Sequence, residues 1–230
     1  MSIYTEVQIQ CPACNGDVPF SLIDSVNVTR ELTQPGLRAS ILDRTFQQEK
    51  CPGCGEEFRI EPEFSYVDFN YGQFIGVWPA DQVSKCSEYE ARTLNVFENA
   101  YGSQAPVEAQ ELGKTLKPRV VFGWNSLNEK LIAGEANIDD VTLELAKLAV
   151  VRKGEVLIDS EHEELRLVGV DDKLVFGWFA QGSENLTELV SISKDIFEEI
   201  DADPESWQAL KEGLTGLFVD YRKLFLATPA

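Results

Sequence analysis

Histidine and basic residues are scarce in this 230-residue sequence, which holds one histidine and 20 lysines and arginines against 39 aspartates and glutamates. Nucleic-acid binding depends on basic side chains that replace counterions on phosphates. No basic cluster occurs in the sequence, so we expect no direct contact with nucleic acid. The single His162 stands among acidic residues in DSEHEEL, a pattern more typical of a solvated turn than of a histidine-activated nucleophile.

Long apolar runs and catalytic sequence motifs are also missing. No run of about 18 apolar residues occurs, so we expect no membrane-spanning segment. The N-terminal MSIYTEVQIQ lacks the basic, apolar and small-residue regions of a signal peptide, so we expect a cytoplasmic protein. Phosphate-binding, dinucleotide-binding and nucleophile-elbow motifs do not occur, so we expect no enzymatic activity.

The acidic excess gives a formal net charge of −19, spread along the whole chain. Such a charge keeps an intracellular protein soluble, which is one interpretation. The other is that the protein binds a partner with a basic surface.

Four of the five cysteines form a metal-binding pattern. Cys11, Cys14, Cys51 and Cys54 read as C-x2-C, then 36 residues, then C-x2-C. An odd cysteine count in a chain expected in the cytoplasm favours a metal over disulfides. Four sulfurs without a neighbouring histidine predict a closed, tetrahedral, structural zinc site. A redox pair, an iron–sulfur cluster or four reduced structural thiols are the alternatives.

The residues around each pair are typical of a tight metal-binding turn, or knuckle. Pro12 and Pro52 fix φ inside the turns, and Gly16 and Gly55 follow the pairs where positive φ is expected. Asn15 stands in the position of Gly55, and asparagine tolerates a left-handed backbone.

Periodicity predicts the remaining elements. We expect an aromatic hairpin over 64–78, a helix over 81–101 with Cys86 on its apolar face, and helices over 126–131 and 138–151. An antiparallel meander follows, from EVLIDS, EELRLVGV and KLVFGWFA, then a strand in ENLTELVSIS and a short helix over 195–200. Asp203 as N-cap and Pro204 at the first position predict a last helix that continues to Phe225.

The predicted fold class is α+β, with an N-terminal zinc-ribbon-like β lobe followed by an α+β lobe that carries the meander and a long C-terminal helix. We expect the lobes at 1–80 and 119–230, with a helix and linker at 81–118. The apolar stripe of the last helix predicts packing on its own sheet, and the alternative is a homodimer seam.

The paired Cys-Pro-x-Cys elements, SVNVT at 25–29 and the aromatic hairpin resemble the bacterial CpXC family. The segment NSLNEKLIAGEANIDDVTLELAKLAV is similar to the C-terminal part of that family, and the likeness covers about 1–80 and 120–180. The resemblance implies zinc binding by the four cysteines and no established general activity. The matching polar positions are Asn125, Asn128, Glu129, Lys130, Asp139, Asp140, Glu144 and Lys147. They either line a binding groove or form a solvated, ion-paired helix surface.

The functional hypothesis that follows is a non-catalytic, zinc-stabilised acidic module that binds a basic protein. Its most concrete version is an immunity protein that neutralises a basic nuclease toxin. The candidate contact residues are Asp195, Glu198, Glu199, Asp201, Asp203 and Glu205. The alternatives are an accessory subunit of a nucleic-acid-processing complex and an enzyme that acts at the polar groove.

Overall fold

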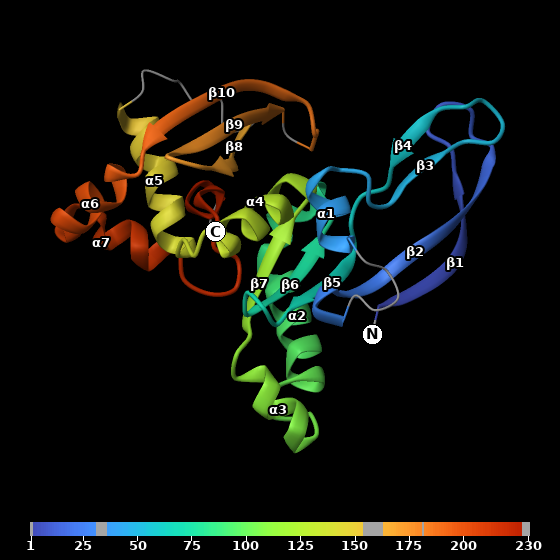
Figure 1. The fold of residues 1–230 in the computed structure, drawn as a ribbon, viewed down its shortest axis with the longest axis horizontal. Coiled ribbons are helices and arrows are strands. Elements are labelled where there is room, and N and C mark those ends of the chain that lie inside the picture. Colours follow the sequence, from blue (N-terminus) through green and yellow to red (C-terminus); the bar gives the residue numbers. More distant parts are fainter. Residues whose placement is uncertain (1, 31–35, 154–162, 181, 227–230) are drawn as a thin grey trace.

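The computed structural model describes residues 2–30, 36–153, 163–180 and 182–226. Their strands form three sheets, of five, three and two strands. Figure 1 shows a central sheet flanked by two projections. An arm made of the far ends of β1 and β2 with β3 and β4 extends to one side, and a C-terminal lobe lies on the other.

The five-stranded sheet has the order β1-β2-β5-β6-β7. β1 pairs with β2 and β5 with β6 in antiparallel fashion, whereas β2 with β5 and β6 with β7 are parallel. The strands are β1 (Ile3–Gln10), β2 (Asp17–Asn27), β5 (Phe64–Asp68), β6 (Gln73–Trp78) and β7 (Lys117–Phe122).

Helices cover both faces of this sheet where β6 and β7 lie, which explains why residues 74–77 of β6 and 120–122 of β7 are buried without alternation. α2 (Cys86–Ala100) lies over one face, where Tyr89 packs with Val120 and Phe122. α4 (Trp124–Glu135) lies over the other, where Leu127 packs with Ile75, Val77 and Val121.

The arm is built from two long and two short strands. β3 (Gln48–Lys50) and β4 (Glu57–Arg59) form the two-stranded sheet, and the far ends of β1 and β2 accompany it. Its apolar cluster is small and includes Cys11, Val18 and Cys51. The arm therefore has little hydrophobic core of its own.

The C-terminal lobe packs the antiparallel sheet β10-β9-β8 against helices. Its elements are α5 (Asp140–Lys153), β8 (Glu163–Val170), β9 (Lys173–Ala180), β10 (Leu186–Ser193), α6 (Asp195–Ala202), α7 (Pro204–Gly213) and the 3-10 helix η3 (Tyr221–Phe225). The two described strands of the predicted meander are confirmed as β8 and β9, and the strand predicted in ENLTELVSIS is confirmed as β10. The third predicted strand, EVLIDS, lies outside the described residues.

Several local predictions are confirmed. The aromatic hairpin is β5 and β6, and Asn70, Tyr71 and Gly72 lie in its turn. The helix expected over 81–101 begins as a 3-10 helix, η2 (Ala80–Lys85), and continues as α2, where Cys86 is buried in the core as expected. The remaining short helices are η1 (Val28–Arg30), α1 (Leu37–Leu42) and α3 (Val107–Gly113).

The predicted extent of the last helix is wrong. Asp203 caps α7 and Pro204 stands at its first position as expected, but the helix ends at Gly213. Gly216 has φ of +93°, which is incompatible with a continuing helix. The chain from Leu214 instead crosses the lobe and places Phe218 and Tyr221 in the core, so their apolar character reflects burial without helical periodicity.

Four strands of the five-stranded sheet precede residue 81, and the fifth, β7, begins inside the segment 81–118 and ends after it. β7 begins at Lys117 and pairs with β6, and α3 lies within the segment expected to be a linker. The division into lobes at 1–80 and 119–230 stays a prediction.

Candidate functional site

Two knuckles at the end of the arm present the paired cysteines. One joins β1 to β2 and the other joins β3 to β4. The backbone N–H of Cys11 donates to the Gly16 carbonyl at 2.9 Å, and Cys51 donates to the Glu56 carbonyl at 2.8 Å. The two turns therefore share one hydrogen-bonding pattern, as their similar sequences require.

A left-handed residue closes each knuckle. Asn15 has φ of 56° and Gly55 has φ of 80°, and their N–H groups donate to the carbonyls of Cys11 and Cys51. Gly16 was expected to supply the positive φ in the first knuckle, and this is wrong, because Asn15 does so. A Cβ atom at Gly16 would lie 3.3 Å from Cys14 Sγ, a tight contact that favours glycine at this position.

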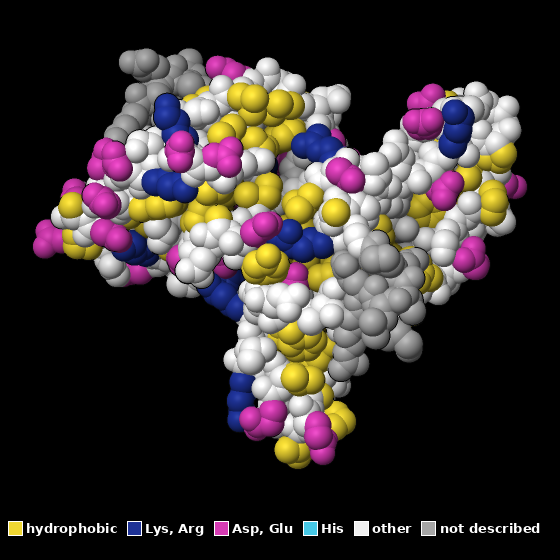
Figure 2. Space-filling view, viewed as in Figure 1, with side chains coloured by type: hydrophobic (Ala, Val, Ile, Leu, Met, Phe, Trp, Pro, Cys, Tyr) yellow, Lys and Arg dark blue, Asp and Glu magenta, His cyan; other side chains and the backbone are white. Residues whose placement is uncertain are grey.

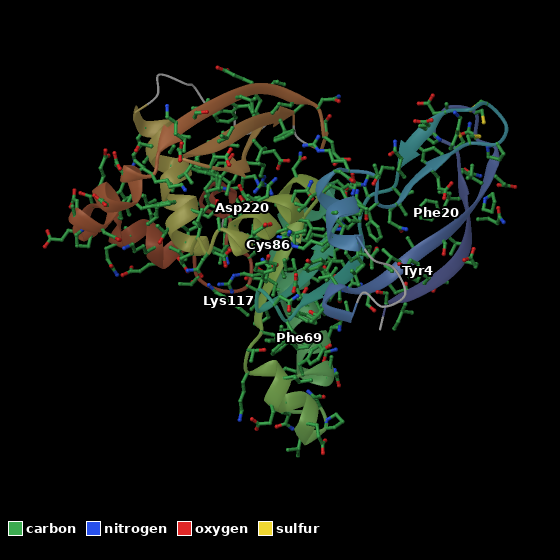
Figure 3. All side chains as sticks on the ribbon, viewed as in Figure 1. Tyr4, Phe20, Phe69, Cys86, Lys117 and Asp220 are labelled. Atoms are coloured by element: carbon green, nitrogen blue, oxygen red, sulfur yellow. The ribbon has the colours of Figure 1, made fainter. Side chains whose placement is uncertain are left out.

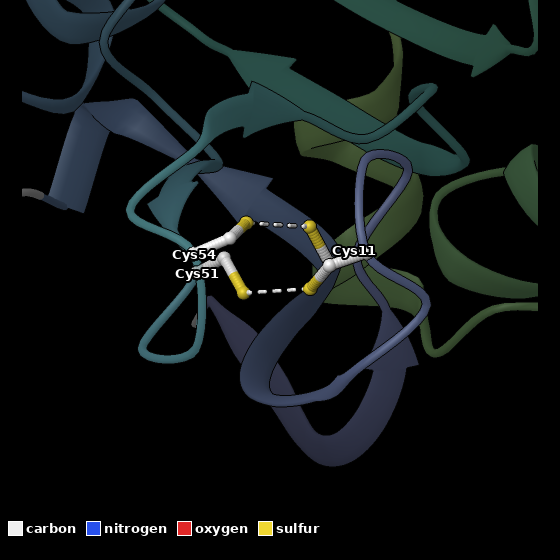
Figure 4. A group of neighbouring side chains, drawn as sticks. Cys11, Cys51 and Cys54 are labelled. Atoms are coloured by element: carbon white, nitrogen blue, oxygen red, sulfur yellow. Dashed lines mark hydrogen bonds between the residues drawn. The ribbon is translucent and has the colours of Figure 1, made fainter.

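The four thiols converge on one point (Figure 4). The Sγ atoms of Cys11 and Cys54 lie 3.7 Å apart, those of Cys14 and Cys51 lie 3.6 Å apart, and all four lie within 4.8 Å of one another. Zn–S bonds of about 2.3 Å in a tetrahedron place sulfurs about 3.8 Å apart. The four cysteines therefore fit a zinc ion.

The backbone favours thiolates here. N–H groups of Cys54 and Gly53 point to the sulfur of Cys51 and lower its pKa to about 6. The N–H of Glu56 acts in the same direction on Cys54, but the neighbouring sulfurs and burial outweigh it and raise the pKa of that thiol. Four thiolates this close repel one another strongly unless a cation lies between them. A divalent ion supplies positive charge that offsets this repulsion.

A zinc ion held by four thiolates has no open position for water, so its role is structural. Cys11 and Cys51 are buried while Cys14 and Cys54 face the solvent. Cys86 lies in the core of the molecule and is not part of the cluster, as expected. Within the described ranges, these four cysteines form the one group of metal-ligating side chains that could hold an ion.

The polar residues of the family-like segment are mostly buried, so the interpretation as a solvated helix surface is wrong for Glu129, Glu144 and Lys147. All three are 0% exposed. Lys147 Nζ lies 2.8 Å from Glu129 Oε1 and 2.7 Å from Glu144 Oε2. Glu144 and Lys147, three residues apart on α5, therefore form an ion pair, but inside the C-terminal lobe.

Residues from β8 and from the end of the chain complete this arrangement, and sequence reasoning missed them. Arg166 contacts Glu129 at 3.0 Å, Glu164 at 2.8 Å and Asp220 at 2.8 Å. The buried charge network consists of four acids and four bases: Glu129, Glu144, Glu164, Asp220, Lys130, Lys147, Arg166 and Arg222. Figure 3 shows Asp220 in the middle of the C-terminal lobe. A charged residue between two leucines, as in Leu165-Arg166-Leu167, was the available signal.

Burial disfavours the charged form of each residue in the network, and the charges of the neighbouring residues determine whether the pKa of a carboxyl is raised or lowered. Lys147 and Arg166 overcome burial and hold the pKa of Glu129 below its ordinary value. Arg166 and Arg222 do the same, more strongly, for Asp220. Burial prevails at Glu144, where the carboxylate of Glu129 adds to it, and the pKa is raised despite Lys147.

The other predicted groove residues lie at the edge of the network. Asn125 donates to Glu164 at 3.0 Å and to the carbonyl of Ser183 at 2.8 Å. Lys130 reaches Asp140 at 3.1 Å. Asp139 caps the start of α5 by accepting hydrogen bonds from the N–H groups of Val141 and Thr142.

The six acidic residues predicted to contact a partner are all exposed. They belong to α6, α7 and the turn between these helices, and Figure 2 shows acidic side chains gathered at this end of the molecule. His162 lies outside the described residues. No helix in the described part of the chain is long and apolar enough to cross a membrane.

No curated protein and no solved structure gives a significant match to this chain. The family model described as CpXC protein matches residues 9–147, which is more than half of the sequence. The match includes both cysteine pairs, which the structure brings together, and the polar segment on α4 and α5. The chain belongs to the CpXC family.

Proposed function

We propose that the chain is a non-catalytic protein-binding module in which a structural zinc ion fixes the arm and an acidic surface recognises a basic partner. The observation that carries the proposal is the exposure of all six carboxylates on α6, α7 and their connecting turn. The whole chain, these six carboxylates included, carries a formal net charge of −19, so the rest of the molecule adds a field of the same sign.

The zinc ion has a clear structural task in this scheme. It joins a knuckle on β1–β2 to a knuckle on β3–β4, which near the cysteines share a small apolar cluster. Structural zinc contributes about 10–16 kcal/mol in small zinc-binding peptides at neutral pH, which is enough to order a segment of this kind.

The acidic surface is suited to attract a partner rather than to hold an ion. Its carboxylates are spread along two helices, and Asp203 is already engaged by the N–H and hydroxyl of Ser206. Exposed charges of one sign accelerate association with a basic protein and make binding sensitive to salt. The specific version of the proposal is an immunity protein that covers the basic nucleic-acid-binding surface of a toxin.

The experiment is a native pull-down from the source cell at low and high salt, followed by mass spectrometry. The test variant carries amides in place of five carboxylates, with Asp203 retained because it caps α7: Asp195, Glu198, Glu199, Asp201 and Glu205. The matched control carries the same five-charge change at exposed acids elsewhere on the molecule: Glu6, Glu49, Glu88, Glu108 and Asp172.

At low salt, we expect the wild type and the control to capture one basic protein in a stoichiometric amount. The test variant at low salt, and all three proteins at high salt, should capture much less of it. The purified partner is then titrated against all three proteins, and its nuclease activity is assayed in their presence. Equal binding by the test variant and the control would overturn the role of the acidic surface. Binding without inhibition would leave a binding module and remove the immunity role.

A further inference from the structure

A cavity of about 390 Å³ lies between the central sheet and the connection from α4 to α5. The β5–β6 turn and the first residues of β6 and β7 form one side of it. The end of α4 and the residues up to Asp140 form the other. The acidic surface and the zinc site take no part in this lining, so the cavity is a separate feature of the molecule.

Three cations of this cavity meet at one carboxylate. Asp140 lies 2.6 Å from Arg119 Nε, 3.1 Å from Lys130 Nζ and 3.4 Å from Lys117 Nζ. Lys117 also reaches Asp139 at 3.4 Å. The lining therefore holds three positive charges and two negative ones, in a chain whose overall charge is −19.

The inner end of this charge cluster is Lys130, whose Nζ also lies 3.5 Å from Glu144 Oε1. Lys130 itself is 5% exposed, and its position is fixed by the carbonyl of Val219, which accepts a hydrogen bond at 3.0 Å. A buried, oriented ammonium group attracts an anion more strongly than a solvated one.

One acceptor in the lining has no partner among the described residues. Gln73 donates from Nε2 to the carbonyl of Lys130 at 2.7 Å, which fixes the amide, while its buried Oε1 lacks a hydrogen bond. A buried acceptor left without a donor costs about 1–3 kcal/mol. Gly134 makes the arrangement sterically feasible, since a Cβ atom there would lie 2.3 Å from Gln73 Nε2.

We propose that this cavity binds a small organic anion, a carboxylate or a phosphate ester, that also carries a hydroxyl or amino donor. Lys117 and Arg119 bind the anionic group beside Lys130, and Gln73 accepts from the donor. The volume lies within the range of small-molecule sites. Ile75 and Ile138 supply apolar contacts for a short carbon chain.

Lys117 is the residue to change, because it is 54% exposed and its loss does not disturb the core. Figure 3 shows it beside the C-terminal lobe, at the start of β7. The matched control is Lys114→Glu, since Lys114 is 68% exposed, lies three positions away in the sequence and does not line the cavity.

The experiment follows amide shifts of the full-length, zinc-loaded protein by NMR during titration with glycerol 3-phosphate or lactate. Glycerol is the neutral comparison and inorganic phosphate the comparison without a hydroxyl-bearing carbon chain. Saturable shifts are expected at Gly72, Gly134 and Asp140. Lys117→Glu weakens the affinity at least about tenfold, whereas Lys114→Glu leaves it within about twofold. The stronger of the two ligands identifies the anion class.

Absence of saturable shifts with both anions at millimolar concentrations would overturn the proposal, as would equal affinities of the wild type and Lys117→Glu. If inorganic phosphate bound as tightly as glycerol 3-phosphate, and lactate did not bind, the part of the proposal that assigns Gln73 to a ligand donor would fail. None of these outcomes depends on the acidic surface, so the proposed protein-binding function is tested separately.

Discussion

Each knuckle supplies one inner and one outer thiol to the metal site. Cys11 and Cys51 are buried, and Cys14 and Cys54 face the solvent. The inner thiols pack with Val18 and with the partly buried Ile9 and Phe58, so their substitution affects both the metal and the apolar contacts of the arm.

Replacing Cys51 with serine is expected to abolish stoichiometric zinc binding. Three remaining thiolates leave the tetrahedron open, and a serine hydroxyl is a poor zinc ligand. Zinc per chain, measured by mass spectrometry of the purified protein, should fall from about one to near zero. Cys86→Ser is the control, since Cys86 is also buried but lies in the core, at the start of α2. Retention of a full zinc complement by Cys51→Ser would contradict the assigned ligand set.

The buried carboxylate of Glu129 stabilises the fold through its ion pairs with Lys147 and Arg166. Glu129→Gln removes the charge that faces Lys147 and Arg166, both of which are at most 1% exposed. Breaking a buried pair in this way costs about 3–5 kcal/mol of unfolding free energy, measured by urea denaturation. Glu111→Gln removes an exposed pair with Lys114 and should cost at most about 1 kcal/mol. Equal effects of the two variants would contradict the importance of burial.

At the scale of elements, the arm and the central sheet differ in what stabilises them. β2 pairs with β5 only through residues 25–27, so the far half of the β1–β2 hairpin extends beyond the pairing with β5 and meets β3 and β4 around the cysteines and their small apolar cluster. β6 and β7 are covered on both faces by α2 and α4.

Removing zinc with a chelator is therefore expected to unfold the arm and leave the central sheet intact. Hydrogen exchange should become fast at the knuckles and in β3 and β4, because few other contacts protect these amides. Amides of β6, β7 and α4 should keep their protection, and they serve as the internal control. Re-addition of zinc should restore the protected state of the arm. Loss of protection in β7 along with the arm would show that zinc stabilises the whole molecule.

Elements with local signals were predictable from the sequence. The knuckles, the aromatic hairpin, the meander and the start of α7 each follow from a turn, cap or periodicity within about ten residues. The end of α7 is not predictable from periodicity, because apolar residues from Leu214 to Phe225 keep a helical spacing across the break at Gly216. The links of Arg166 to Glu129 and to Asp220 in the buried charge network were not predictable, because these residues are far apart in the sequence. Arg166 and Asp220 are separated by 54 positions, and no local pattern joins them.

At the scale of the whole molecule, several buried acids link stability to pH. Burial opposes the ionisation of Asp140, Glu164 and Asp220, but the neighbouring cations prevail and hold each pKa below its ordinary value. A carboxyl with a depressed pKa contributes stability above its unfolded pKa and loses that contribution as the pH falls toward its folded pKa.

The contribution of Asp140 to the pH dependence of stability can be measured with Asp140→Asn, because this substitution leaves the zinc ligands unchanged. The difference in unfolding free energy between wild type and variant should be constant from about pH 7 to about pH 5. It should shrink as the pH falls below about 4, where Asp140 is protonated in the unfolded chain but not in the folded one. Asp172→Asn, on the exposed β8–β9 turn, should follow the wild type at every pH. A constant difference down to about pH 2 would contradict the depressed pKa of Asp140.

The position of Asp220 and Arg222 in the sequence bears on how the molecule matures during synthesis. The ribosome releases the N-terminus first, so all four cysteines have emerged long before α5 is made. Glu144 accepts a hydrogen bond from the N–H of Tyr221, which lies 77 positions later in the chain. The nascent arm can acquire its metal early, whereas the charges of the C-terminal lobe are balanced only after residues 220 and 222 have been made. A chain that is stalled or cleaved before Asp220 therefore carries a finished arm and an unfinished lobe, a state that quality-control proteases are suited to recognise.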